Sequence, residues 1–273
     1  MSGCFGMCFG AGKSKGCDFV TIQPTFAIKN WAEAEKFFPE FIAKSKAGPG
    51  VIYYGFTADK ENNRAFCREA YVDASAARAH LDAVGQILTD FTAEHASLES
   101  LAIHGSKAEL AKLKPTTDAF GAAYYEFQCG YTNLEELSAS STEAPYVFCT
   151  IQPTFKINDA KAVEKFMPAI VERTKDETGL LYYGFTLDQA NQKLFCREAY
   201  ADGDGILAHL ANVETILSDA LTSKAIELEA IDIHGPAPEL AKTKDKTKAL
   251  GAKYYDVVTD VGAFVKFKAA SSN

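Results

Sequence analysis

The chain has 273 residues, 47% of them apolar and 23% charged, which is the composition of a soluble globular protein of one or two domains. Its formal net charge of −8 argues against a nucleic-acid partner, because phosphate binding needs clustered Lys and Arg side chains. No apolar run approaches the length of a membrane span, so we expect no transmembrane segment.

The first 17 residues, MSGCFGMCFGAGKSKGC, predict a flexible tail. They lack the long apolar stretch of a secretory signal, and the seven Cys residues of the chain fit a reducing compartment, so we expect a cytoplasmic protein. Cys4 and Cys8 could carry reversible acylation, which would tether the protein weakly to a membrane. The GAGKS segment is not a phosphate-binding loop, because Met7 stands where that motif requires Gly.

Two segments of the chain are nearly identical. IQPTFAIKN begins at Ile22, and IQPTFKIND begins at Ile151, which is 129 positions later. At the same shift YYGFT and FCREAY recur unchanged, and after one inserted residue HG, ELAK and YY recur as well. The sequence therefore predicts a tandem duplication of one domain of about 125 residues, a common domain size. The predicted organisation is a tail (1–17), a first domain (18–131), a polar, Ser-rich linker (132–145) and a second domain (146–273).

The second copy predicts the following elements in chain order: a strand (147–157), a helix capped by Asn158 or Asp159, a hairpin of two strands (180–187 and 193–201), an amphipathic helix (204–221), a strand (226–234), a short helix (238–249) and a last strand (252–261). This order, β-α-β-β-α-β with an added helix and strand, is the ferredoxin-like arrangement of an α+β fold. Segments such as LLYYGF offer apolar side chains to both faces of the sheet. We therefore expect the sheets of the two copies to meet face to face, about 10 Å apart, and to cover each other.

Three segments of the second copy, ETGLLYYGFTLD, LFCREAYAD and LAHL, lie between Glu177 and Leu210. Together with GPGVIYYGFTAD, AFCREAYVD and RAHL in the first copy, they resemble the antibiotic biosynthesis monooxygenase (ABM) superfamily of dimeric α+β barrels. The resemblance implies an intrachain dimeric α+β barrel, a pseudo-dimer of two ferredoxin-like repeats. It also implies a pocket in each copy, between the helices and the sheet.

Proteins that the chain resembles include cofactor-free oxygenases acting on phenols, quinol oxygenases, haem-degrading enzymes and proteins of no settled activity. For the haem-degrading branch, the resemblance would require a haem-ligand His near the end of the second helix, where this chain has about Asp90 and Asp219. The Trp that the family usually has after the Glu of the third strand is replaced by Tyr71 and Tyr200. These departures argue against haem chemistry.

His80 and His209 lie on the second helix of each copy. His209 shares a helical stripe with Val213, Ile216 and Ala220, so its imidazole should border the face that looks at the sheet. A neutral His there could act as a general base on a phenol or quinol, because the usual pKa of His is close to working pH. The structural alternative is a His at the helix edge that hydrogen-bonds a backbone group or a carboxylate.

Charged and aromatic side chains of the strands are further candidates. Arg68-Glu69 and Arg197-Glu198 lie in apolar strands, where alternation places Arg and Glu on opposite faces. Arg68 and Arg197 could bind a substrate enolate or carboxylate, or could take part in an ion pair that links the copies. Several tyrosines could bind a ring substrate or could simply pack in the core: Tyr54, Tyr183, Tyr71 and Tyr200.

We therefore predict a cofactor-independent monooxygenase that acts on a small phenolic or quinol-type substrate, with His80 and His209 as bases. The substrate would supply the electrons to O₂ and the protein a dry pocket, so we expect no cofactor. We expect no metal site either, since no Cys–His spacing matches a zinc motif, and His104 and His234 are expected to be structural. The alternative is a non-catalytic small-molecule-binding or stress-response protein on the same scaffold. The pseudo-dimer could also pair again as a homodimer.

Overall fold

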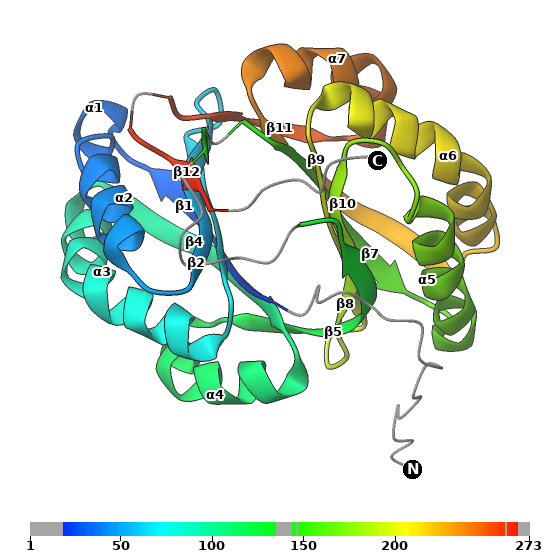
Figure 1. Cartoon of the computed structure of the whole chain (residues 1–273), viewed down its shortest axis with the longest axis horizontal. Helices are drawn as coiled ribbons and strands as arrows, with labels where there is room; N and C mark the ends of the chain where they lie inside the picture. Colours follow the sequence, from blue (N-terminus) through cyan, green and yellow to red (C-terminus); the bar gives the residue numbers. More distant parts are fainter. Residues whose placement is uncertain (1–18, 135–143, 146, 260, 267–273) are drawn as a thin grey trace.

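The computed structural model describes residues 19–134, 144–145, 147–259 and 261–266, which form helices around a ring of strands (Figure 1). The expected N-terminal tail with Cys4 and Cys8, and most of the expected linker, lie outside the described residues. Within the described part of the chain, no helix combines the length and the apolar character that crossing a bilayer requires.

The first half of the chain begins with a strand and contains two long helices. Its elements are β1 (Val20–Ile28), α1 (Trp31–Ala34), α2 (Phe38–Ala47), β2 (Val51–Asp59), β3 (Arg64–Tyr71), α3 (Ala74–Glu94), β4 (Ala96–Gly105), α4 (Lys107–Thr117), the 3-10 turn η1 (Asp118–Phe120) and β5 (Ala123–Thr132). Helix α2 is separate from α1 and has Pro39 in its first turn. The backbone N–H groups of a first turn have no partner within the helix, so the N–H that proline lacks costs no hydrogen bond there.

The second half repeats this order of elements, with one helix where the first half has α1 and α2 and with two added short strands. It contains β6 (Ala144–Pro145), β7 (Cys149–Ile157), α5 (Ala160–Thr174), β8 (Leu180–Asp188), β9 (Lys193–Tyr200), α6 (Gly203–Thr222), β10 (Ile226–Gly235), α7 (Ala237–Thr247), the 3-10 turn η2 (Lys248–Leu250), β11 (Lys253–Val257) and β12 (Phe264–Val265). Asp159 caps α5, and its carboxylate accepts from the backbone N–H groups of Lys161 and Ala162. The elements expected from the residue pattern up to α7 are therefore confirmed within about two residues, the usual uncertainty of element ends.

Ten of the described strands form a closed barrel, in the order β11-β10-β7-β9-β8-β5-β4-β1-β3-β2 and back to β11. Two antiparallel seams join the halves: β5 pairs with β8, and β11 pairs with β2. Gly130 permits the first seam, because a Cβ at this position would lie 2.3 Å from the carbonyl oxygen of Tyr183. The expectation of two stacked sheets needs correction, since the last strand of each half extends the sheet of the other half and leaves no open edge there.

The barrel wall is buried on both faces. Every residue of β2 from Val51 to Ala58 is buried. On the outer face, under the helices, Phe56 stacks on Phe38 with ring centroids 4.1 Å apart. On the inner face, Tyr53 meets Tyr182 of the other half, with 3.1 Å between the two hydroxyl oxygens. Because a fully buried aromatic or aliphatic side chain contributes about 1.5–3 kcal/mol, both faces stabilise the fold, the outer face within a half and the inner face between the halves.

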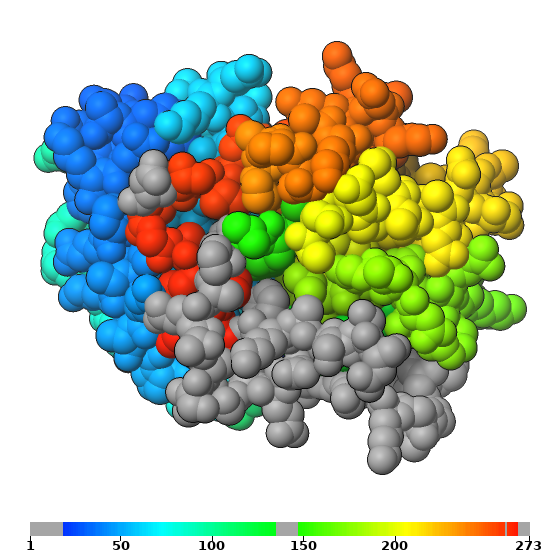
Figure 2. Space-filling view, turned by 45° about the horizontal axis from the view of Figure 1, so that its top comes forward, coloured from blue at the N-terminus to red at the C-terminus, as the bar shows by residue number. Residues whose placement is uncertain are grey.

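The end of the chain differs from the expected last strand. A strand was expected over residues 252–261, but β11 ends at Val257, where Asp256 and Val257 pair with β2 at this seam. Strand β12 then pairs with β2 beside Tyr54 and Tyr53. Figure 2 shows this C-terminal segment, in red, against the blue first half of the chain. The two halves are thus joined by hydrogen bonds over most of the length of β2.

Candidate functional site

A cavity lies between the helices and the outer face of the sheet in each half. The first cavity has a volume of about 300 Å³ and the second a volume of about 420 Å³. Both are walled mostly by aromatic and aliphatic side chains, and the lining of each includes one His and the Glu beside it, His80 with Glu69 and His209 with Glu198. At the edge of each cavity a 3-10 turn contributes an exposed apolar side chain, Phe120 at 53% and Leu250 at 48% exposure. Volumes of this size suit small, largely apolar ligands.

His80 in the first cavity is part of a buried polar cluster. Its Nε2 lies 3.1 Å from Oε2 of Glu69, and the Tyr71 hydroxyl donates to the same oxygen. Its Nδ1 lies 3.3 Å from the hydroxyl oxygen of Ser45, which donates its own proton to the Phe41 carbonyl. A hydroxyl proton rotates to suit its partners, so Ser45 can accept from Nδ1–H or turn its own proton to an unprotonated Nδ1, whereas Nε2 faces the Glu69 carboxylate, which only accepts.

The elements of the first half determine this geometry. The alternation of β3 puts Glu69 and Tyr71 on the face that looks at the helices. The Asp73 carboxylate accepts from the Ala76 N–H and starts α3 directly after the strand. This start places His80 among the buried residues of α3, where it is 3% exposed. The short connection from β3 to α3 thus holds the imidazole of His80 over the carboxylate of Glu69.

His209 in the second cavity contacts two carboxylates. Its Nε2 lies 3.1 Å from Glu198, as in the first half, and the Tyr200 hydroxyl donates to Glu198 at 2.6 Å. Its Nδ1 lies 3.0 Å from Glu177, which is part of the loop before β8. The expected histidines therefore line the two cavities, but their second ring nitrogens have different partners.

Burial shifts the pKa values of the groups around the cavities. Burial is the largest effect on His209 and lowers its pKa, but the charge of Glu198 and the hydrogen bond and charge of Glu177 together outweigh it, and the pKa is raised. Burial likewise raises the pKa of Glu198, against the opposing effect of His209. Burial raises the pKa of four tyrosines well above the ordinary value, namely Tyr54, Tyr71, Tyr183 and Tyr200. These hydroxyls stay protonated and can act as hydrogen-bond donors.

The four candidate tyrosines have two different positions. Tyr54 and Tyr183 line the cavities, and their ring centroids lie 5.1 Å and 5.3 Å from those of His80 and His209. Tyr71 and Tyr200 are fully buried behind the cavities and contact the glutamates. The first pair can touch a ligand, whereas the second pair orients the acceptor that the imidazole faces.

Arg68 and Arg197 lie on the inner face of the barrel, away from both cavities. Arg68 donates to the Phe148 carbonyl at 3.3 Å and to the Thr150 hydroxyl at 3.1 Å. Arg197 donates to the Phe19 carbonyl at 2.9 Å, and its guanidinium lies over the Phe19 ring. Both arginines thus link one half to the other, and the structure does not bring them together with the histidines of the cavities.

His104 and His234 also bridge the halves inside the barrel. His104 Nδ1 lies 2.8 Å from the Thr186 hydroxyl oxygen, and His234 Nδ1 lies 2.8 Å from that of Thr57. Burial, and after it the charge of the nearby Arg197 or Arg68, lowers the pKa of each His well below the ordinary value. Both imidazoles are therefore uncharged at neutral pH.

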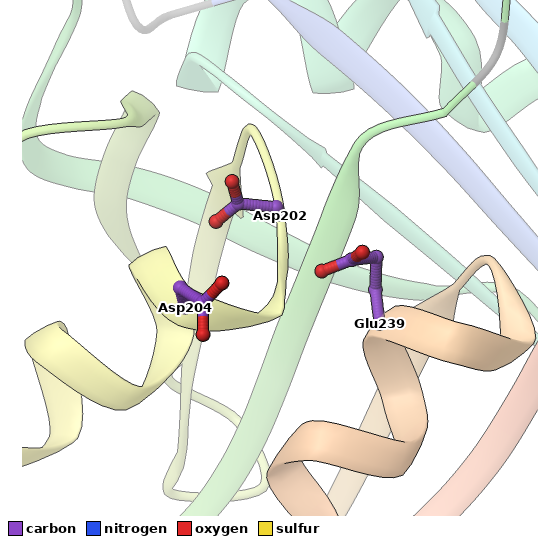
Figure 3. Close-up of side chains that lie close together, drawn as sticks. All are labelled: Asp202, Asp204 and Glu239. Carbon is purple, nitrogen blue, oxygen red and sulfur yellow. The ribbon is translucent and has the colours of Figure 1, made fainter.

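Three carboxylates converge near the starts of α6 and α7: Asp202, Asp204 and Glu239 (Figure 3). Each already has a structural partner. Asp202 accepts from the Gly205 N–H, Glu239 accepts from the Gly203 N–H, and Lys242 lies 2.7 Å from Asp204 and 2.9 Å from Glu239. The cluster is largely open to solvent and partly neutralised by Lys242, so capping and helix docking explain it without a metal.

Glu69, Glu198, Glu177 and Ser45 complete the site, although they are not among the residues expected there from the sequence. For Glu69 and Glu198 a signal existed, because alternation placed each on the helix-facing side of an apolar strand. A buried carboxylate there needs a partner, and His80 or His209 is the ionisable side chain opposite. Glu177 and Ser45 carried no such signal, since their contacts depend on how a loop and a helix end pack against α6 and α3.

Comparison with known proteins supports the fold. No protein-family model and no curated protein matches the chain. A solved structure from Fusobacterium nucleatum described as a "putative monooxygenase" has 16% identity and a TM-score of 0.54, over 79% of this chain and 89% of that one. An "anthrone oxidase-like protein" has 8% identity and a TM-score of 0.46, over 95% and 96% of the two chains. MupZ from Pseudomonas fluorescens has 29% identity and a TM-score of 0.37, and the match covers 40% of this chain and 89% of MupZ. The Fusobacterium structure has the dimeric α+β barrel fold, and the closed barrel of this chain is similar to it.

Proposed function

We propose that this protein is a cofactor-independent monooxygenase acting on a small phenolic or quinol-type substrate. The observation that supports the proposal is the buried His–Glu–Tyr cluster beside an apolar cavity in each half. The likeness to the Fusobacterium protein concerns the fold only, so the activity is inferred from the cavity and its polar cluster.

The first cavity offers what a phenol needs to lose its proton. Nε2–H of His80 can donate to Glu69 while Nδ1 accepts from the Ser45 hydroxyl, and this uncharged ring can take up the phenol proton, with Glu69 stabilising the imidazolium that forms. Glu69 is in turn oriented by the Tyr71 hydroxyl. Tyr54 on the cavity wall can donate a hydrogen bond to a ring oxygen. The side chains thus convert the substrate to its electron-rich anion.

The electrons for the reaction come from this anion. It transfers electrons to O₂ and forms a carbon–oxygen bond at the activated ring carbon, which gives a hydroperoxide. Loss of water from the hydroperoxide breaks the O–O bond and leaves a carbonyl, so one oxygen atom enters the product and the other leaves as water. Apolar walls such as Phe56 and Val84 keep bulk water away from these intermediates. The net reaction needs substrate and O₂ and no other reductant.

A non-catalytic binding protein is the second candidate. Both ring nitrogens of each cavity histidine already have partners within the fold, so a ligand could fill the cavity without any proton transfer. Such a protein would bind the same class of small aromatic ligand, and it would consume no oxygen.

Oxygen uptake separates the two candidates. The native protein is incubated with a panel of quinols and anthrone-like phenols, with and without a metal chelator, and O₂ is followed with an electrode. Monooxygenation predicts uptake that resists the chelator and is lost in the double variant His80→Ala/His209→Ala. Saturable ligand binding without uptake on any substrate would favour the binding protein. Uptake unchanged in the double variant would remove the histidines from the mechanism.

A further inference from the structure

The two cavities have matching walls but differ behind the histidine. The same side chains recur around both imidazoles: Tyr54 and Tyr183, Cys67 and Cys196, Glu69 and Glu198, Tyr71 and Tyr200. Where the second half has Glu177, however, the first half has Gly48, and where the second half has Asn212, the first half has Ala83. The duplicated site therefore has an additional carboxylate and an additional amide in one copy.

Glu177 is held in a defined orientation. The side-chain amide of Asn212 donates to Glu177 at 2.7 Å and to the Arg173 carbonyl at 3.0 Å. Arg173 donates from Nε to the Asn212 carbonyl at 2.9 Å, which ties the end of α5 to α6. Glu177 does not belong to the cavity lining, and it reaches the imidazole of His209 from behind, at Nδ1. Any effect of Glu177 on a ligand must therefore pass through His209.

The partner of Nδ1 decides how many protons the imidazole holds. In the first half this partner is the Ser45 hydroxyl, which can donate to an unprotonated Nδ1 as well as accept from Nδ1–H. In the second half a carboxylate faces each ring nitrogen, and an ionised carboxylate can only accept a hydrogen bond. Both nitrogens of His209 then act as donors, which agrees with its raised pKa.

We propose that Glu177 is a positioning residue that keeps His209 doubly protonated, so that the second cavity binds an uncharged phenolic ligand without taking its proton. The inference rests on the proposed function in one respect, since it assigns the proton transfer to the first cavity. Among the ionisable groups that face His209, Tyr183 and Tyr200 stay protonated, which leaves Glu198 to accept a hydrogen bond from the ligand. Two nearby carboxylates disfavour a phenolate or carboxylate ligand.

The protonation state of His209 can be measured directly by nitrogen-15 NMR on the full chain labelled at its five histidines. His209→Gln identifies the signal. We expect both ring nitrogens to carry protons near neutral pH. Glu177→Gln keeps the shape of the side chain and the contact with Asn212 but removes the charge, and it should shift the titration midpoint to lower pH. Glu172→Gln removes a carboxylate of α5 that is 72% exposed and should leave the midpoint in place.

Two NMR results would overturn the inference: an uncharged His209 in the native protein near neutral pH, or the same midpoint in Glu177→Gln and native protein. Circular dichroism melting of both variants verifies that they fold. This measurement needs no substrate, so it decides the role of Glu177 even if no phenol is oxidised and the proposed function fails.

Oxygen uptake with 1,8-dihydroxyanthrone as the probe tests the division between the cavities. His80→Gln should lower uptake far more than His209→Gln does. In the His80→Gln background, Glu177→Gln should restore part of the uptake, because His209 then becomes able to accept a proton. Equal loss of uptake in the two single histidine variants would place the transfer in both cavities and refute the division.

Discussion

The inner and outer faces of β3 and β9 place neighbouring residues in different roles. On the inner face, Arg68 and Arg197 donate to backbone carbonyls of the opposite half. On the outer face, Glu69 and Glu198, each one residue further along, accept from a His and a Tyr at the edge of a cavity. These roles are separated only because successive side chains of a strand point to opposite faces of the sheet. The inner face joins the halves, whereas the outer face retains space for a ligand.

Replacing the inner arginine should produce the largest effect on stability. Arg68→Ala leaves the Phe148 carbonyl and the Thr150 hydroxyl without this donor and opens a hole in the barrel. We expect the free energy of unfolding to fall by about 3–5 kcal/mol in chemical denaturation. Lys112→Ala is the control, because this exposed lysine pairs with Glu109 of its own helix and its loss should change the free energy of unfolding far less. Similar losses in both variants would contradict the linking role of the inner face.

Replacing the outer glutamate should affect activity more than stability. Glu69→Gln keeps the shape and can still accept from Tyr71, but it no longer stabilises an imidazolium at His80. On the proposed function, oxygen uptake should fall by about 100-fold or more, the range of a lost acid–base contribution. The surface variant Glu99→Gln should keep full uptake. If Glu69→Gln retains native turnover, the outer cluster is structural.

The histidines of the two faces should respond to pH in opposite directions. His104 and His234 on the inner face have pKa values lowered by burial and then by the nearby arginines, so they contribute full stability above the ordinary value of 6.5. This contribution is lost as pH falls below 6.5, because the unfolded chain takes up the protons, with a slope of up to about 1.4 kcal/mol per pH unit for each His. His209 on the outer face has a raised pKa, so its contribution is lost as pH rises through that pKa.

Denaturation curves measured across this pH range test the difference. The double variant His104→Gln/His234→Gln should flatten the acid side of the stability profile, and His209→Gln should flatten only the alkaline side. If the free energy of unfolding falls equally steeply below pH 6.5 in the native protein and in the double variant, other groups control the acid side of the profile.

The smallest expected effect concerns the tyrosines behind the glutamates. Tyr71→Phe removes one hydrogen bond to Glu69 without changing the cavity wall, and turnover should fall by about tenfold, as for a lost hydrogen bond to a charged group. The matched change Tyr200→Phe in the second half should leave turnover near the native value if proton transfer belongs to the first cavity. A larger loss in Tyr200→Phe than in Tyr71→Phe would reverse this assignment.

Local patterns in the sequence were sufficient to predict the elements and much of the site. The apolar stripe around His209 predicted correctly that this side chain faces the sheet, and the alternation in β3 predicted that Arg68 and Glu69 separate. The partners of these side chains could not be predicted in the same way. His80 and Ser45 come from different helices, and the Glu177 contact depends on the loop before β8.

The sequence by itself determined the internal repetition, the order of strands and helices, and the face on which each charged residue lies. These properties follow from periodicity and local backbone chemistry, which act between residues close in the chain. Only the tertiary structure decided that β5 and β11 cross to the opposite half and close a barrel, and that one imidazole meets a hydroxyl where its counterpart meets a carboxylate. Such contacts depend on packing between distant segments, and a change of one residue in a loop is enough to alter them.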